Sequence, residues 1–250
     1  MESLTGAPRS VYRRNEQVVT FFPEARVVRT ERRESLGIST GLLKSSDSAI
    51  PEFYAARRVG SDRVAGFETD VVQLAPRDAL RFGYRIWSEK KSGLVVKLQT
   101  VDAEGNVLEQ SAFSELALDA PVRVDKLTQM MSATSGWRIE SAEVMKTTAE
   151  KEGWQLAAPP PGFKPISCYK RPVAGQAPEG TMQWIFSDGL AAVSLFIEPF
   201  DARRHVQEGL FASGATQTVT RRIQDWWLTA VGEVPSATLR AFAQGLDRRK

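Results

Sequence analysis

The sequence predicts a mainly β fold of the α+β class, arranged as two domains. Through the first half of the chain, apolar and polar residues alternate in short runs separated by turn-forming residues, as in antiparallel strands. Pro159, Pro160 and Pro161 then interrupt the chain and are followed by Gly162. Because proline lacks an N–H and fixes its backbone, neither a helix nor a central strand continues there. A second β-rich part ends in one helical stretch, as in a small α+β domain.

The composition limits the kind of protein. With 250 residues, 42% apolar and 25% charged, the chain can form two modest domains and is too apolar for general disorder. Its 33 basic residues nearly balance its 30 acidic ones and form no basic stripe, so we expect no nucleic-acid partner. Cys168 is the only cysteine, which excludes an intramolecular disulfide and a cysteine-based zinc site. No apolar run approaches the roughly 20 residues of a membrane helix.

The first segments predict a hairpin, a loop and a short helix. Apolar runs in residues 9–33 predict a β-hairpin with Pro23 and Glu24 at its turn. The Ser- and Gly-rich residues 31–51 predict a mobile loop or a weak edge strand, and residues 50–54 predict the start of a short helix.

Residues 59–118 predict the clearest β region, a meander of antiparallel strands. Phe82, Tyr84 and Ile86 alternate with less apolar neighbours, as in a half-buried strand. Most apolar side chains of this meander fall on one face, so we expect that face to need a cover or a ligand.

A helical segment and the proline-rich segment close the first domain. Residues 124–131 predict a short helix with Leu127, Met130 and Met131 facing inward. The prolines mark the best domain boundary. We therefore expect a first domain, a linker and a second domain at residues 1–150, 151–162 and 163–250.

The second domain is organised around a predicted hairpin at residues 182–199. Met182, Trp184 and Phe186 share one face of its first strand, and Asp188-Gly189 suits a tight turn. Further strands are expected at residues 215–222 and 225–234, followed by a helix that buries Leu239, Phe242 and Leu246.

No residue pattern predicts catalysis. His205 lies beside two arginines in an expected loop, where a solvated side chain is the favoured interpretation over a catalytic one. Cys168 is expected to be a small buried residue. The sequence has no Gly-x-Ser-x-Gly elbow, no phosphate-binding glycine loop and no metal motif. It therefore predicts a binding protein rather than an enzyme, with no cofactor and no metal.

Several short motifs, in this order along nearly the whole chain, resemble the RseB/MucB family of periplasmic sigma-factor regulators. The matching motifs are RVAG at 63–66, PRD at 76–78, RFGYRIW at 81–87, GNVLEQ at 105–110 with Phe113, PGF at 161–163, RP at 171–172, FSDGL at 186–190, VSLFIE at 193–198 and VGEVP at 231–235.

The resemblance implies a fold, a location and partners. The first domain would be an unclosed antiparallel barrel similar to the lipoprotein carriers LolA and LolB, truncated at its start, and the second a smaller α+β domain. The family binds the periplasmic domain of a membrane-spanning anti-sigma factor, RseA or MucA, and shields it from regulated proteolysis. The envelope-stress sigma factor thus stays restrained, and lipopolysaccharide or other lipids relieve the block. The resemblance also implies a periplasmic location. Homo-oligomerisation stays open.

The front of the chain departs from the family. The family's export signal, first helix and opening strands do not precede Leu4, so we expect an N-terminal truncation, by a late gene start or by shortening. Their loss would bare a sheet edge.

Two other functions and two sets of site residues follow from these patterns. A lipid or lipoprotein carrier of the LolA/LolB type is the main alternative, and an envelope scaffold without a ligand is another. Phe82, Tyr84 and Ile86 are predicted to line a lipid cavity if lipid is bound, although core packing is the favoured explanation for each of them. Arg221 and Arg222 are predicted partner contacts, although a solvated face is the favoured explanation for each.

Overall fold

The computed structural model describes residues 8–32, 50–121, 123–141, 145–171 and 180–249. The chain falls into two compact units. Unit 1 combines residues 1–35 with 117–145, and unit 2 combines residues 36–116 with 146–250.

Unit 1 is a small four-stranded sheet with one helix. Its strands, in the spatial order β1-β2-β3-β9, are β1 (Ser10–Arg14), β2 (Gln17–Phe22), β3 (Val27–Arg32) and β9 (Arg138–Ser141). Strands β2 and β3 form the predicted hairpin, with Phe22 opposite Val27. β9 was not predicted, and it pairs with β3 in parallel. Helix α2 (Val124–Ser132) precedes β9 in the sequence.

Few apolar side chains hold unit 1 together. Val19, Phe21 and Val28 form its buried cluster, and Trp137 meets the Phe21 ring edge-to-face at 5.2 Å. Met131 is the α2 residue that packs on this cluster. The expectation that Leu127 and Met130 face inward is wrong: both are exposed. Among the described residues of unit 1, Met131 is thus the α2 side chain that packs against this cluster, while Leu127 and Met130 stay exposed.

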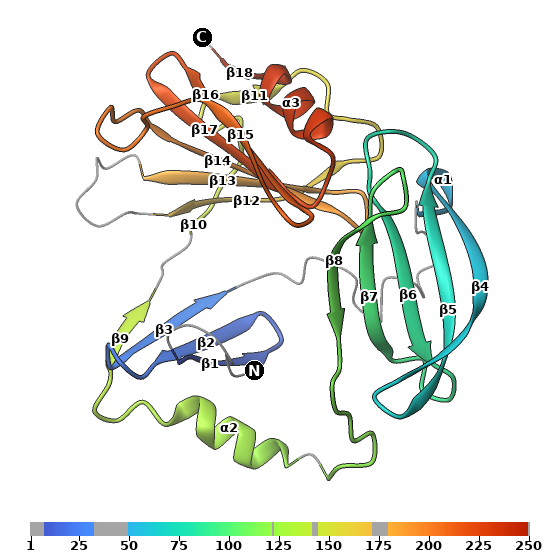
Figure 1. Cartoon of the computed structure of the whole chain (residues 1–250). Coiled ribbons are helices and arrows are strands. Elements are labelled where there is room, and N and C mark those ends of the chain that lie inside the picture. Colours follow the sequence, from blue (N-terminus) through green and yellow to red (C-terminus); the bar gives the residue numbers. More distant parts are fainter. Residues whose placement is uncertain (1–7, 33–49, 122, 142–144, 172–179, 250) are drawn as a thin grey trace. The chain divides into compact units, whose positions relative to one another are not determined.

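Unit 2 begins with an open antiparallel sheet of five sequential strands (Figure 1). Its elements are α1 (Ile50–Phe53), β4 (Tyr54–Val64), β5 (Phe67–Pro76), β6 (Gly83–Glu89), β7 (Val95–Val101) and β8 (Val107–Ala112). Each strand pairs with the next, which confirms the predicted meander. Among the described strands β8 does not pair back to β4, so the sheet is unclosed, as predicted.

A seven-stranded sheet forms the rest of unit 2. Its strands, in the spatial order β10-β12-β13-β14-β17-β16-β15, are β10 (Met145–Lys146), β12 (Lys164–Arg171), β13 (Thr181–Ser187), β14 (Ala192–Pro199), β15 (Gly209–Ser213), β16 (Thr216–Ile223) and β17 (Trp226–Gly232). Helix α3 (Ser236–Gly245) packs on β16 and β17. The short strands β11 (Trp154–Leu156) and β18 (Leu246–Arg248) pair beside it (Figure 1).

The largest core of the chain lies between this sheet and α3. Leu195, Leu228 and Ala230 of the sheet are fully buried, as are Leu239 and Phe242 of the helix. The predicted helical face is therefore confirmed. Leu246 is buried too, but it belongs to β18, immediately after the helix ends.

Candidate partner-binding site

The turn of the central hairpin is built around Asp188. Asp188 Oδ1 accepts the backbone N–H groups of Leu190 (2.9 Å) and Ala191 (2.8 Å), which fixes the turn between β13 and β14. Gly189 has a φ of 101°, a conformation that glycine adopts readily and other residues rarely. The tight turn predicted from Asp188-Gly189 is therefore confirmed.

The second oxygen of Asp188 bonds to the five-stranded sheet. Asp188 Oδ2 accepts a hydrogen bond from Arg81 Nε at 2.7 Å and one from the Tyr54 hydroxyl at 3.0 Å. The side chains of Arg81 and Asp188 are both 0% exposed. Since an unpaired charge is costly to bury, this pair depends on both of its members.

Arg81 is surrounded on all sides. Its other guanidinium nitrogens bond to the Asp78 carboxylate and to the Pro161 carbonyl. Its guanidinium carbon lies 4.2 Å from the centre of the Phe53 ring and 5.2 Å from that of Phe163, within range of cation–π attraction. One arginine thus connects the five-stranded sheet, the proline-rich segment and the seven-stranded sheet.

Two buried tyrosines complete this cluster. Burial, reinforced by the neighbouring Tyr84 and by the charge of Asp188, raises the pKa of the Tyr54 phenol above its ordinary value. Burial, followed by the charge of Asp188, raises the pKa of Tyr84 as well. Tyr54 therefore stays protonated and donates to Asp188.

Apolar and backbone contacts lie beside the ion pair. Leu190, from the hairpin, belongs to the same apolar cluster as Ile50 of α1 and Leu74 and Ile86 of the five-stranded sheet. Thr238 Oγ1 of α3 donates to the carbonyl of Leu80 at 2.7 Å. We call the contacts of Arg81, Asp188, Tyr54 and Leu190 the hairpin junction.

The predicted lipid-wall residues lie near the hairpin junction. Tyr84 and Ile86 point to the same face of β6 and pack in the cluster that contains Leu190. Phe82 directly precedes β6 and is buried outside that cluster. The described structure thus fills this face with protein side chains, and a role in lipid binding stays a prediction.

The two predicted partner-contact arginines are adjacent on β16 but point to opposite faces of the sheet. Arg221 lies on the α3 side, where its Nη1 donates to the carbonyl of Ala243 at 2.9 Å. The Arg222 guanidinium lies on the other side, 3.9 Å from the centre of the Phe200 ring. Both residues are exposed, but the structure does not bring them into one contact patch.

His205 lies in a loop, as expected, but the expectation that it is solvated is wrong. Its ring is buried and stacks on Trp227, with 4.9 Å between ring centres and 8° between planes. His205 Nδ1 accepts the N–H of Asp201 at 2.9 Å, and Nε2 lies 3.2 Å from Glu198. His205 therefore packs the loop that follows β14 against the sheet. The sequence does not show this role, because the neighbouring arginines indicate an exposed segment.

Cys168 is buried, as expected, on the α3 side of the sheet. Burial, followed by the charge of Glu152, raises the pKa of its thiol to about 11. Trp227, on which His205 stacks, points to the opposite face from its buried neighbour Leu228. Cys168 and His205 therefore do not form a nucleophile–base pair.

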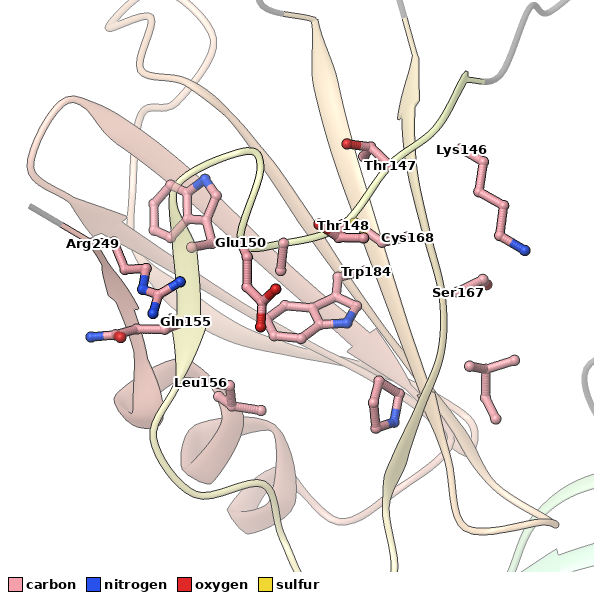
Figure 2. Close-up of a pocket in the computed structure, with 14 residues that line it drawn as sticks. Lys146, Thr147, Thr148, Glu150, Gln155, Leu156, Ser167, Cys168, Trp184 and Arg249 are labelled. Atoms are coloured by element: carbon pink, nitrogen blue, oxygen red, sulfur yellow. The ribbon is translucent and has the colours of Figure 1, made fainter.

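A cavity of about 590 Å³ lies beside strand β12 (Figure 2). Cys168 and Trp184 line it from the sheet, and Gln155 and Leu156 line it from the segment that passes over the sheet. Within the described part of the chain, no three His, Cys, Asp or Glu side chains gather as a metal site. The cavity offers surface for binding and shows no arrangement for catalysis.

Sequence reasoning missed the hairpin junction. Asp188 was predicted as a turn residue only, and Arg81 had no predicted role. The available signal was that both residues lie within the motifs RFGYRIW and FSDGL. The structure places those two motifs in contact, although they are 107 positions apart.

Two family models match the chain over most of its length. The MucB/RseB N-terminal domain matches residues 1–131, and the MucB/RseB C-terminal domain matches residues 148–247. The chain belongs to the MucB/RseB family.

The regulatory protein MucB of Pseudomonas aeruginosa, described as regulating the sigma factor AlgU, is 30% identical over 80% of this chain. That match spans 62% of the relative's own length, less than two thirds. The sigma-E factor regulatory protein RseB of Escherichia coli is 22% identical over 97% of this chain and 74% of its own length.

Solved structures agree with the family membership. The crystal structure of MucB in complex with MucA(peri) superposes with a TM-score of 0.66 at 27% identity, over 97% of this chain and 83% of that one. The Pseudomonas aeruginosa MucA/MucB complex gives a TM-score of 0.64 at 25% identity, over 97% and 83% of the two chains. Among the described residues, no helix has the length and apolar character needed to cross a membrane.

Proposed function

We propose that this chain is a periplasmic regulatory protein that binds the periplasmic domain of a MucA-like anti-sigma factor. The observation that supports this best is the likeness, over nearly the whole chain, to MucB bound to MucA(peri). Binding would shield the anti-sigma factor from regulated proteolysis and so restrain the envelope-stress sigma factor.

The proposal includes relief of this block by lipopolysaccharide or another lipid. An acyl chain would enter along Phe82, Tyr84 and Ile86, on the apolar face of the open sheet. Because Leu190 packs in the same cluster, an acyl chain entering there would compete with the hairpin of the seven-stranded sheet. This competition supplies a physical route from lipid to partner.

The test is a pull-down of the full chain with the periplasmic domain of the MucA homologue from the same genome. We expect direct binding. We also expect the first regulatory protease to cleave that domain more slowly when the chain is bound. Absence of binding by a folded full-length protein would rule the proposal out.

Because Arg221 and Arg222 face opposite sides of the sheet, each is to be reversed in charge separately. Unchanged affinity removes the corresponding residue from the partner contacts.

A lipid or lipoprotein carrier of the LolA/LolB type is the second candidate. The open, apolar-faced meander of β4 to β8 favours it. A carrier must load and release a lipid, so it predicts acyl-chain transfer between donor and acceptor vesicles. The seven-stranded sheet and helix α3, which a minimal carrier does not need, favour the regulatory function instead. Transfer without binding to the anti-sigma domain would reverse that choice.

A further inference from the structure

The two edges of the seven-stranded sheet differ in their protection against further strand pairing. At the β12 edge, Pro165 lacks an N–H, a bulge lies between Pro165 and Ser167, and β10 covers part of the strand. Proline, bulges and short covering strands are the usual means by which proteins block an edge. Strand β15, at the opposite edge, contains none of them: its sequence is Gly-Leu-Phe-Ala-Ser, without proline or charge.

The backbone of β15 offers free hydrogen-bonding groups. Gly209 donates its N–H toward β16, to Thr220 Oγ1 at 2.9 Å. Since backbone groups of successive residues point to opposite sides of an antiparallel strand, those of Leu210 and Ala212 point to the open side. Among the described strands, none pairs with β15 on that side.

Large apolar side chains accompany this open edge. Leu210 is 42% exposed and Phe211 is 55% exposed, on opposite faces of the strand. On the Leu210 face, a groove of about 480 Å³ lies between β15 and α3, and Val219 and Ala243 are among its lining residues. A strand added to β15 would place alternate side chains over this groove and beside Phe211.

The groove is positively charged. Arg221 and Arg240 line it, and Arg221 is held there by its bond to the Ala243 carbonyl. Within the part of the chain that the structure describes, Arg240 has no ion-pair partner. Glu208, the acidic residue of the groove, accepts the backbone N–H of Arg222 at 2.7 Å. Two arginines against one carboxylate leave the groove with a net positive charge.

We propose that β15 is a docking edge for an extended, acidic segment of the anti-sigma factor's periplasmic domain. The inference rests on the proposed function and adds the place and mode of contact. The segment pairs with the backbone of Leu210 and Ala212 as an added strand. Its acidic side chains reach Arg240 and Arg221, and apolar side chains of its other face cover Phe211.

The same charges disfavour a second copy of this chain as the occupant. Pairing β15 with its own copy around a two-fold axis would continue the sheet, with both α3 helices on one face. The Arg221 and Arg240 side chains of the two copies would then face each other across the seam, and like charges repel. An acidic segment meets no such repulsion.

The test measures the affinity of edge variants for the purified periplasmic domain of the MucA homologue. Leu210→Glu places a negative charge in the groove, where it repels an acidic segment, and Ala212→Pro removes one outward N–H without touching the bonds to β16. Each is expected to weaken binding about tenfold, the first by like-charge repulsion and the second by a lost hydrogen bond. Arg240→Gln, on the helix, is expected to weaken binding about threefold and to reduce its salt dependence.

Ile166→Glu is the matched control for Leu210→Glu, since Ile166 is 46% exposed on the protected edge of the same sheet. It is expected to bind like the wild type. Circular dichroism and urea midpoints exclude misfolding, and Arg240→Gln leaves the strand itself intact. If the wild type does not bind, the proposed function fails. If the wild type binds and all three groove and edge variants bind equally well, the docking edge alone is wrong. If the free chain dimerises and Ala212→Pro makes it monomeric, a second copy occupies the edge and the proposal is overturned.

Discussion

Asp188 uses its two carboxylate oxygens for two different tasks. Oδ1 holds the hairpin turn through two backbone N–H groups, and Oδ2 binds Arg81 and Tyr54 of the other sheet. In Asp188→Asn, the amide oxygen could still accept the two backbone N–H groups of the turn. The amide nitrogen could not accept the hydrogen bonds of Arg81 and Tyr54, and Arg81 would lose a buried counter-charge.

We predict that Asp188→Asn lowers the free energy of unfolding by about 3–5 kcal/mol, the range for breaking a buried ion pair from one side. Asp201→Asn is the control, since Asp201 pairs with the highly exposed Arg203 and exposed pairs contribute about 1 kcal/mol or less. Urea denaturation measures both. Equal losses in the two variants would contradict a special role for the buried pair. Adding Arg81→Met to Asp188→Asn should recover part of the loss, since no buried guanidinium then lacks its counter-charge, and Asp78, which also loses Arg81, is 32% exposed and can be hydrated.

The two buried tyrosines predict a loss of stability in alkali. Tyr54 and Tyr84 have raised pKa values when folded, chiefly through burial. Above about pH 10 the unfolded chain releases both phenol protons and the folded chain keeps them. The unfolded state then binds fewer protons, so the free energy of unfolding falls as the pH rises.

Urea midpoints between about pH 8 and 11 measure this effect. Tyr84→Phe removes one of the two groups and should make the decline above about pH 10 less steep, with parallel curves below it. If stability declines with pH as steeply in Tyr84→Phe as in the wild type, the Tyr84 phenol has the same pKa in the folded and the unfolded chain, and the prediction is wrong.

At the scale of elements, the proline-rich segment is part of the hairpin junction and not a free connector. Pro161 offers its carbonyl to Arg81. Gly162 has a φ of 84°, and a methyl group there would lie 2.5 Å from Arg81 Nη2 and 2.6 Å from the Phe53 ring. Gly153 has a similar φ of 78° and no neighbour within 4 Å of such a methyl group.

This contrast predicts different costs for the same substitution. Gly153→Ala should lower the free energy of unfolding by about 1 kcal/mol, the cost of an unfavourable backbone conformation alone. Gly162→Ala should cost about 1–3 kcal/mol more, because the ring and the guanidinium must move. Differential scanning calorimetry and urea denaturation give both values. If the two losses are equal, the segment does not pack on Arg81 in solution.

Elements with strong local signals were predictable. Alternation in β6, the Asp188-Gly189 turn and the spacing of Leu239 and Phe242 each gave an element that the structure confirms. Leu127 shows the limit of such signals. Periodicity identifies the apolar face of a short helix, but whether a partner covers that face depends on tertiary packing.

The hairpin junction was not predictable for a related reason. Arg81 and Asp188 are 107 positions apart, and each has an ordinary local explanation, a strand flank and a turn. No rule of spacing brings them together, because their meeting depends on how two sheets pack. The β15 edge was missed for another reason: exposure and a free edge exist only once strand order is known.

At the scale of the whole molecule, the domain bounds expected from the sequence, with a linker at 151–162, remain a prediction. The contacts within unit 2 predict that its two sheets depend on each other for stability. Leu190, Thr238 and Asp188 of the second domain each contact the five-stranded sheet or belong to its apolar cluster. If those contacts carry much of the stability, β6 and β13 open together. Unit 1, with its own cluster around Phe21, opens separately.

Hydrogen exchange of the intact chain measures this directly. In the wild type, amides of β6 and β13 should exchange with opening free energies within about 1 kcal/mol of each other. In Asp188→Asn, protection in β6 and β13 should fall, and protection in β2 of unit 1 should stay unchanged. β6 amides that open several kcal/mol below those of β13 in the wild type would mean that the hairpin junction does not couple the sheets. Lipid could then act on the first sheet without reaching the second, and relief of partner binding would need another route.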